Sequence, residues 1–124
     1  MIAGLGIDIT DVERIATNIR QEAGFRELVF SKKEIDYCES KTDKYVHYAA
    51  RFAAKEAFFK ALGTGWADGT FFNEVEVTNN DIGKPELFLT GSTAKARQDD
   101  EKITISLSMT HSKTMASAVV IIEK

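Results

Sequence analysis

The sequence contains very little cysteine and proline. Its 124 residues include one cysteine, Cys38, and one proline, Pro85. A single cysteine excludes an intrachain disulfide, which fits a reducing, cytoplasmic setting. The chain also lacks internal repeats, low-complexity segments and linkers. We therefore expect one domain over residues 1–124, which is long enough to bury a core of its own.

Long hydrophobic runs and an excess of basic charge are also absent. No apolar run approaches the roughly 18 residues of a transmembrane helix, so we expect no membrane span. The first ten residues lack a basic segment and include Asp8, which argues against a signal peptide. The net charge of -3 argues against general nucleic-acid binding. The composition is 44% hydrophobic and 28% charged, as in an ordinary globular protein.

Residues 2–9 alternate between two kinds of side chain, which predicts a strand. One face is apolar and is expected to belong to the core, whereas the other is small or acidic. Leu5, Ile7 and Ile9 lie on the apolar face, and Gly4, Gly6 and Asp8 lie on the other. Because the two glycines have no side chains, we expect them to leave room beside the carboxylate of Asp8.

Helices are predicted after this strand. Two of these helices begin with a capping-box pattern, which satisfies the first backbone N–H groups of a helix. One begins near residue 10, and the other spans about 32–40. The patterns pair Thr10 with Glu13 and Ser31 with Glu34. A long helix is predicted over about 43–62, and Gly63 is its C-terminal stop.

The second half of the chain is patterned mainly for strands. Alternating or apolar runs occur at 75–78, 86–90, 102–109 and 115–122, with a short helix predicted at 92–99. A strand, then helices, then an antiparallel set of strands predicts the α+β class, with the antiparallel sheet packed against the long helix.

Glu56 lies on the apolar stripe of the long helix. A helix advances about 100° per residue, so Glu56 falls among ring and alanine side chains. These are Tyr45, Tyr48, Ala49, Phe52 and Phe59. An unpaired buried carboxylate is costly. Glu56 therefore needs a bound cation, a basic partner or a half-exposed position, and a pair with Lys60 at i, i+4 is the simplest alternative.

Asp8 also has two interpretations. It caps the helix that begins near Thr10, or it binds a metal ion. A strand-end aspartate and a mid-helix glutamate could share Mg²⁺, which takes one or two protein carboxylates together with water and substrate phosphates.

The end of the long helix is basic and then rich in glycine. Arg51, Lys55 and Lys60 bring positive charge to this helix, and KALGTG (60–65) follows. A glycine-rich turn either presents backbone N–H groups to an anion or simply ends the helix. His111 lies in THSKT, between the last two strands. It is either an exposed hairpin residue or a group that binds phosphate or transfers a proton.

Two segments taken together resemble the signature motifs of the holo-acyl-carrier-protein synthase family, the short 4′-phosphopantetheinyl transferases of bacterial fatty acid biosynthesis. They are GLGIDITDVERI (4–15) and RFAAKEAFFKALGTG (51–65). GKP (83–85) and SMTHS (108–112) resemble the later motifs in the same order. The resemblance covers nearly the whole chain and implies the 4′-phosphopantetheinyl transferase-like fold.

The resemblance also implies a reaction. The 4′-phosphopantetheine group moves from coenzyme A to a serine of apo-acyl carrier protein, and adenosine 3′,5′-bisphosphate leaves. Asp8 and Glu56 would bind Mg²⁺, Lys60 would lie near the diphosphate, and Glu56 or a metal-bound water would accept the serine proton. Residues implied in coenzyme A binding are Lys44, Arg51, Lys60, Gly63, Thr64, Gly65, Lys84, Pro85 and His111. Those implied in carrier-protein binding are Arg14, Arg20 and Phe25.

The family forms homotrimers with active sites between subunits, and the resemblance implies the same here. Two other hypotheses compete with the transferase. One is a non-catalytic module that binds coenzyme A or a nucleotide, which would keep Lys60 and the glycine-rich turn without needing Asp8 and Glu56 as a pair. The other is a structural α+β protein in which Glu56 pairs with Lys60.

Overall fold

The structure, a computed structural model, describes three stretches of the chain: residues 1–63, 71–97 and 102–124. Within them, a strand is followed by helices, a β hairpin, a short helix and two further strands. This order, together with antiparallel pairing throughout the described strands, confirms the predicted α+β class. Among the described helices, none is both long and apolar enough to span a membrane.

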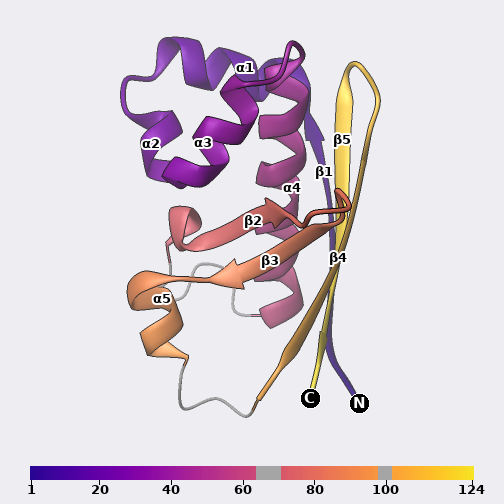
Figure 1. The fold of residues 1–124 in the computed structure, drawn as a ribbon. Helices are drawn as coiled ribbons and strands as arrows, with labels where there is room; N and C mark the ends of the chain where they lie inside the picture. The colour runs from indigo at the N-terminus through magenta and orange to yellow at the C-terminus, as the bar shows by residue number, and fades with distance from the viewer. Residues whose placement is uncertain (64–70, 98–101) are drawn as a thin grey trace.

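Three antiparallel strands form the main sheet (Figure 1). They are β1 (Ile2–Asp11), β5 (Met115–Glu123) and β4 (Thr104–His111), in the order β1-β5-β4. The central strand β5 pairs with both neighbours, so that Ala118 lies opposite Asp8 on one side and opposite Met109 on the other. Asp8 is thereby placed on an outer strand of the sheet.

The long helix α4 (Lys44–Leu62) packs against this sheet (Figure 1), as predicted. It meets a row of small and branched side chains on β5 that are all buried: Ala116, Ala118, Val120 and Ile122. Alanines and phenylalanines fill its own buried surface. The helix ends at Gly63, whose φ of 76° places it in the left-handed conformation of a C-terminal cap.

Three shorter helices gather around the end of the molecule where α4 begins (Figure 1). They are α1 (Val12–Gln21), α2 (Phe25–Val29) and α3 (Lys32–Glu39). The predicted capping box of Ser31 and Glu34 is confirmed at the start of α3. The predicted box of Thr10 and Glu13 is wrong, because β1 continues to Asp11 and the Asp11 carboxylate accepts hydrogen bonds from the backbone of Glu13 and Arg14.

A hairpin of β2 (Val75–Asn79) and β3 (Pro85–Leu89) crosses α4 and runs beside β4 (Figure 1). The short helical turn η1 (Phe72–Glu74) precedes the hairpin, and helix α5 (Gly91–Ala96) follows it. The strand and helix predictions for this half are confirmed, although α5 begins and ends earlier than the 92–99 predicted and β4 extends to His111.

The expected orientation of β1 is wrong. Leu5, Ile7 and Ile9 were expected in the core, but they are 64%, 64% and 67% exposed in the single chain. The opposite face, which carries Gly4 and Gly6, is the one that packs against α4. Alternation identifies two faces of a strand, but it does not decide which of them the helix covers.

Candidate active site

Asp8 and Lys60 meet where β1 passes α4. The Lys60 ammonium group donates to Oδ1 of Asp8 at 3.2 Å and to the backbone carbonyl of Ile7 at 2.9 Å. The other carboxylate oxygen of Asp8, Oδ2, accepts a hydrogen bond from the Thr10 hydroxyl at 2.8 Å. Asp8 is thus oriented by two donors, and it does not cap α1, because Asp11 does.

Glu56 lies one turn before Lys60 on α4 and is half-buried. The Glu56–Lys60 ion pair, one of the alternatives that the sequence left open, is absent from the described residues, since Lys60 pairs with Asp8 instead. The Glu56 carboxylate makes no hydrogen bond or ion pair with any described residue. Burial raises its pKa, and the negative charge of Asp8 raises the pKa further, while Lys60 and Arg14 oppose the rise. The charge of Asp8 therefore opposes the ionisation of Glu56.

Gly4 and Gly6 bring β1 and α4 unusually close together. A Cβ atom on Gly6 would overlap the carbonyl oxygen of Ala57, and one on Gly4 would overlap that of Ala61. The glycines were expected to leave open space beside Asp8, and this is wrong, because the helix backbone fills that space. Their effect is to set the separation at which residues of α4 face Asp8.

The described residues contain no group of three or more histidine, cysteine or acidic side chains suited to a metal ion. The two carboxylates at this site are those of Asp8 and Glu56. Mg²⁺ often uses one or two protein carboxylates and takes its other ligands from water and phosphates. Because an unpaired carboxylate lies within the electrostatic influence of a second one, this donor set fits Mg²⁺.

Lys55 does not contribute to this basic site. It was expected to add positive charge beside Lys60, but it is 0% exposed and its ammonium group bonds the Glu34 carboxylate at 2.7 Å. Lys55 is therefore on another side of α4, within the protein interior. Three basic residues of this helix were expected to bring positive charge to the site, and Lys60 is the one that does so.

Arg51 is also buried, at 1% exposure. Its guanidinium group donates to Oδ1 of Asn79 at 2.6 Å and lies 4.1 Å from the centre of the Tyr37 ring. Its Nε atom is buried and has no hydrogen-bond partner among the described residues. Buried polar groups are usually paired, so this donor marks a place suited to an acceptor. No local sequence pattern indicated Asn79 as its partner.

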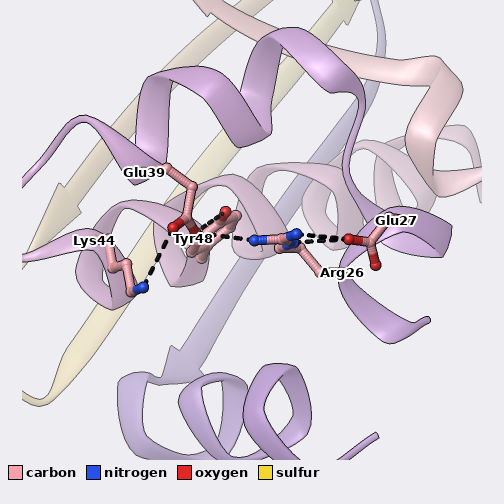
Figure 2. Close-up of polar contacts among 5 residues, drawn as sticks. All are labelled: Arg26, Glu27, Glu39, Lys44 and Tyr48. Atoms are coloured by element: carbon pink, nitrogen blue, oxygen red, sulfur yellow. Dashed lines mark hydrogen bonds and ion pairs between the residues drawn. The ribbon is translucent and has the colours of Figure 1, made fainter. Parts of the chain in front are cut away.

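Lys44 belongs to a polar network that joins α2, α3 and α4 (Figure 2). At its centre, the Glu39 carboxylate accepts from the Tyr48 hydroxyl at 2.6 Å and from Lys44 and Arg26 at 3.3 Å each. These contacts, led by the Tyr48 hydrogen bond, lower the pKa of Glu39. Arg26 also pairs with Glu27. Lys44 is therefore anchored near the start of α4 by a carboxylate of α3.

His111 lies at the end of β4 and contacts α4 through a second histidine. Its ring centre is 5.9 Å from that of His47, which in turn lies 5.7 Å from that of Tyr37. Burial lowers the pKa of His47, although Asp43 at 3.1 Å opposes this. His47 thus links His111 to Tyr37, the ring over which Arg51 lies. Helical periodicity did not single out His47 for this position.

All of the GKP segment and part of the predicted glycine-rich turn lie within the described residues. Gly63 is the C-terminal cap of α4, whereas Thr64 and Gly65 lie outside the described residues. Lys84 is exposed in the turn between β2 and β3, where its backbone N–H donates to the Asn80 side chain at 3.0 Å. Pro85 begins β3.

Arg14 and Arg20 lie on the exposed surface of α1. Arg14 lies 5.7 Å from the centre of the Phe52 ring, and Arg20 pairs with Glu13 at 2.8 Å. Phe25, at the start of α2, is half-buried against the core. Arg14 therefore lies beside an apolar ring on the side of α4 that also carries Glu56.

Comparison with known proteins places this chain in a class. A family model of the 4′-phosphopantetheinyl transferase superfamily matches residues 4–116. The chain is 58% identical over 85 residues, 68% of its length, to the holo-[acyl-carrier-protein] synthase of Cytophaga hutchinsonii, of which these residues cover 67%. These matches define a class of group-transfer enzymes.

Solved structures narrow the class further. The structure resembles holo-[acyl-carrier-protein] synthase from Neisseria meningitidis with a TM-score of 0.89 and 32% identity, covering 100% of each chain. It also resembles a holo-(acyl-carrier-protein) synthase from Bacillus anthracis in complex with coenzyme A (3′,5′-ADP), with a TM-score of 0.81 and 34% identity, covering 98% of this chain and 96% of that one. The chain belongs to the 4′-phosphopantetheinyl transferase superfamily and, within it, to the holo-[acyl-carrier-protein] synthases.

Proposed function

We propose that this enzyme transfers the 4′-phosphopantetheine group of coenzyme A to a serine of apo-acyl carrier protein, in the cytoplasm and in support of fatty acid biosynthesis. One observation carries the proposal. Asp8 and Lys60 come from two segments of different motifs and meet at 3.2 Å, with the unpaired carboxylate of Glu56 one turn away. A relative of the same family was solved with coenzyme A (3′,5′-ADP).

Asp8 and Glu56 are the residues that would hold Mg²⁺. When bound, the ion supplies positive charge that stabilises the nonbridging oxygens of a diphosphate. The hydrogen bonds from Lys60 and Thr10 orient the Asp8 carboxylate for this role. Glu56 lacks a partner among the described residues, and the bound ion would be its partner.

The proposed reaction exchanges one phosphorus–oxygen bond for another. The serine oxygen bonds to the phosphorus next to pantetheine, the bond to the bridging oxygen breaks, and adenosine 3′,5′-bisphosphate leaves with the electron pair. Lys60 stabilises the charge that develops on the leaving group. The serine proton passes to a base, and we propose Glu56 for this role, because it lies one turn from Lys60 on α4.

We further propose that Arg51, Lys44 and His111 bind the 3′-phosphate of coenzyme A or lie beside it. The buried, unpaired Nε of Arg51 supports this, because a guanidinium donor forms strong hydrogen bonds with phosphate oxygens. Gly63, Thr64 and Gly65 are proposed to contact the diphosphate. Lys84 and Pro85 are proposed at the adenine edge.

The carrier protein is proposed to dock on Arg14, Arg20 and Phe25, because acidic partners are steered by arginines and anchored by apolar contacts. We also propose a homotrimer in which residues of two subunits complete each active site. The exposed apolar row of Leu5, Ile7 and Ile9 supports self-association, since contiguous exposed apolar surface is uncommon on monomers.

Intact-mass analysis of apo-acyl carrier protein tests the proposed function. The carrier is incubated with this protein, coenzyme A and Mg²⁺, and in a parallel sample with excess chelator. We expect the carrier to gain the mass of one 4′-phosphopantetheine group with Mg²⁺ and to stay unchanged with chelator. No gain under any condition would reject the enzymatic function, whereas equal gain in both samples would reject the metal requirement.

A further inference from the structure

Lys55 occupies an unusual position for a lysine, because it is completely buried and fully hydrogen-bonded. Its ammonium group donates to Glu34 Oε1 at 2.7 Å and to the backbone carbonyls of Phe72 and Val75 at 2.8 and 2.6 Å. A lysine ammonium has three protons. Each of them therefore has an acceptor of the protein itself.

Glu34 is equally well satisfied. Its Oε1 also accepts the backbone N–H of Ser31 at 2.9 Å, and its Oε2 accepts that of Val77 at 2.9 Å. The residue is 1% exposed. Lys55 and Glu34 thus form a buried junction that connects α3, α4, η1 and β2 by directional contacts.

This junction holds α4 on a different side from the glycine contacts. On one side, the carbonyls of Ala57 and Ala61 lie against Gly6 and Gly4 of β1. On another, Lys55 reaches α3 and β2. Glu56 is next to Lys55 in the chain, so its side chain emerges about 100° further around the helix. The rotation of this turn about the helix axis determines where Glu56 points.

Stability alone gives little reason for a buried ion pair here. Replacing such a pair by well-packed apolar side chains is often neutral or stabilising. Apolar contacts, however, have no direction and permit small rotations of a helix, whereas three hydrogen bonds from one ammonium group do not. The junction is better explained by a need for fixed geometry.

We propose that Lys55 and Glu34 are positioning residues, whose buried ion pair fixes the rotation of α4 so that Glu56 faces Asp8. Neither residue touches the substrate or the metal ion. The inference rests on the proposed function, because it assumes that Asp8 and Glu56 bind one metal ion together.

Binding of Mn²⁺ to the protein with coenzyme A, followed by electron paramagnetic resonance, tests this inference. Lys55→Met should weaken Mn²⁺ binding by about tenfold, the lower end of the range for groups that orient metal ligands. In the double variant Lys55→Met/Glu34→Gln no unpaired charge is left in the interior, so urea unfolding should show part of the stability recovered. Recovery is partial because the amide has one oxygen for the two backbone N–H groups that Glu34 accepts. The Mn²⁺ affinity of the double variant should stay weakened, because the bonds to Phe72 and Val75 are still missing.

Glu74→Gln is the matched control. The Glu74 carboxylate accepts hydrogen bonds from the backbone and hydroxyl groups of Ser92 and Thr93 and joins η1 to α5, with no hydrogen bond to Lys55 or Glu34. This variant should lose stability and keep its Mn²⁺ affinity. Wild-type Mn²⁺ affinity in the folded single variant or in the folded double variant would overturn this inference and leave the proposed function standing. Absence of Mn²⁺ binding by the wild-type protein would overturn the proposed metal site and this inference with it.

Discussion

The ammonium group of Lys60 lies 3.2 Å from Asp8 although 52 residues separate them in the chain. The pair is not a strong element of stability, because the Lys60 side chain is 55% exposed and surface ion pairs contribute about 0–1 kcal/mol. The pair matters for the position of the charge. It keeps a cation next to the carboxylate that would bind the metal ion, where the proposed reaction would require phosphate charge to be neutralised.

Lys60→Met is therefore expected to impair transfer far more than folding. The kcat for carrier modification should fall by about 100- to 1,000-fold, as when one preorganised charge-stabilising donor is removed. The free energy of unfolding in urea should change by at most about 1 kcal/mol. Lys32→Met, which removes an exposed pair with Asp36 on α3, should leave both quantities nearly unchanged. Equal kcat values in the two variants would contradict the role of Lys60.

Glu56→Gln should reduce transfer by at least about 100-fold, above the losses seen when groups behind a metal ligand are removed. It should also stabilise the metal-free protein at pH 7. A raised pKa means that the folded state holds the Glu56 proton more tightly than the unfolded state. The wild type therefore loses stability as the pH rises from the ordinary glutamate pKa to the raised pKa of folded Glu56. The difference between variant and wild type should vanish below the ordinary glutamate pKa of about 4.3.

Urea unfolding at pH 7 and at pH 3.5, without added metal, measures this difference, and intact-mass analysis measures transfer. Glu86→Gln, on the exposed side of β3, is the control and should change neither. A Glu56→Gln variant that is less stable than wild type at pH 7 would show that the carboxylate has a partner that the structure does not describe.

Gly6→Ala should destabilise the protein by about 1–3 kcal/mol, the usual range for overpacking. The added methyl group would overlap the Ala57 carbonyl, so β1 and α4 must move apart. This movement should also separate Asp8 from Glu56 and weaken transfer in the molecules that remain folded. Urea unfolding and a transfer assay at a temperature where the variant is folded measure both effects. Unchanged stability would show that the strand and helix are not held at contact distance.

Cys38 should be unreactive in the native protein. Its side chain is completely buried, and burial raises the pKa of the thiol to about 12. At pH 8, only about one thiol in 10,000 is then the reactive thiolate. A disulfide reagent such as DTNB should label one thiol per chain in urea and almost none without it. Rapid, complete labelling of the native protein would contradict the burial of Cys38.

Local signals in the sequence were sufficient for several parts of the fold. The capping box of Ser31 and Glu34 depends on residues three apart, and Gly63 ends α4 by its own backbone preference. Both were predicted correctly. The helix cap at Thr10 was wrong by one residue, because pairing with β5 extends β1 to Asp11.

Contacts between distant segments could not be predicted in this way. Lys55 and Glu56 are neighbours in sequence, but their environments are decided by Glu34, 21 residues before Lys55, and by Asp8 on another strand. In the same way, only the close approach of α4 to the glycines explains why Ile7 faces outward. The proposed metal pair was recognisable because a family motif records such distant relationships.

The outward face of β1 leads to the last prediction, which concerns the proposed trimer. Ile7→Lys places a charge in the middle of the exposed row of Leu5, Ile7 and Ile9. Lys60 contacts the backbone carbonyl of Ile7 rather than its side chain, so the substitution should leave that contact within one subunit intact. If the row is buried between subunits, the charge should dissociate the trimer.

Light scattering should show a trimer for the wild type and a monomer for Ile7→Lys, and transfer should fall in parallel because two subunits are proposed to complete each site. Ile82→Lys is the matched control, since Ile82 is 87% exposed in the turn between β2 and β3 and does not belong to this row. It should stay trimeric and active. A monomeric wild type would contradict the proposed assembly, whereas a monomeric Ile7→Lys variant with full activity would show that one chain carries a complete active site.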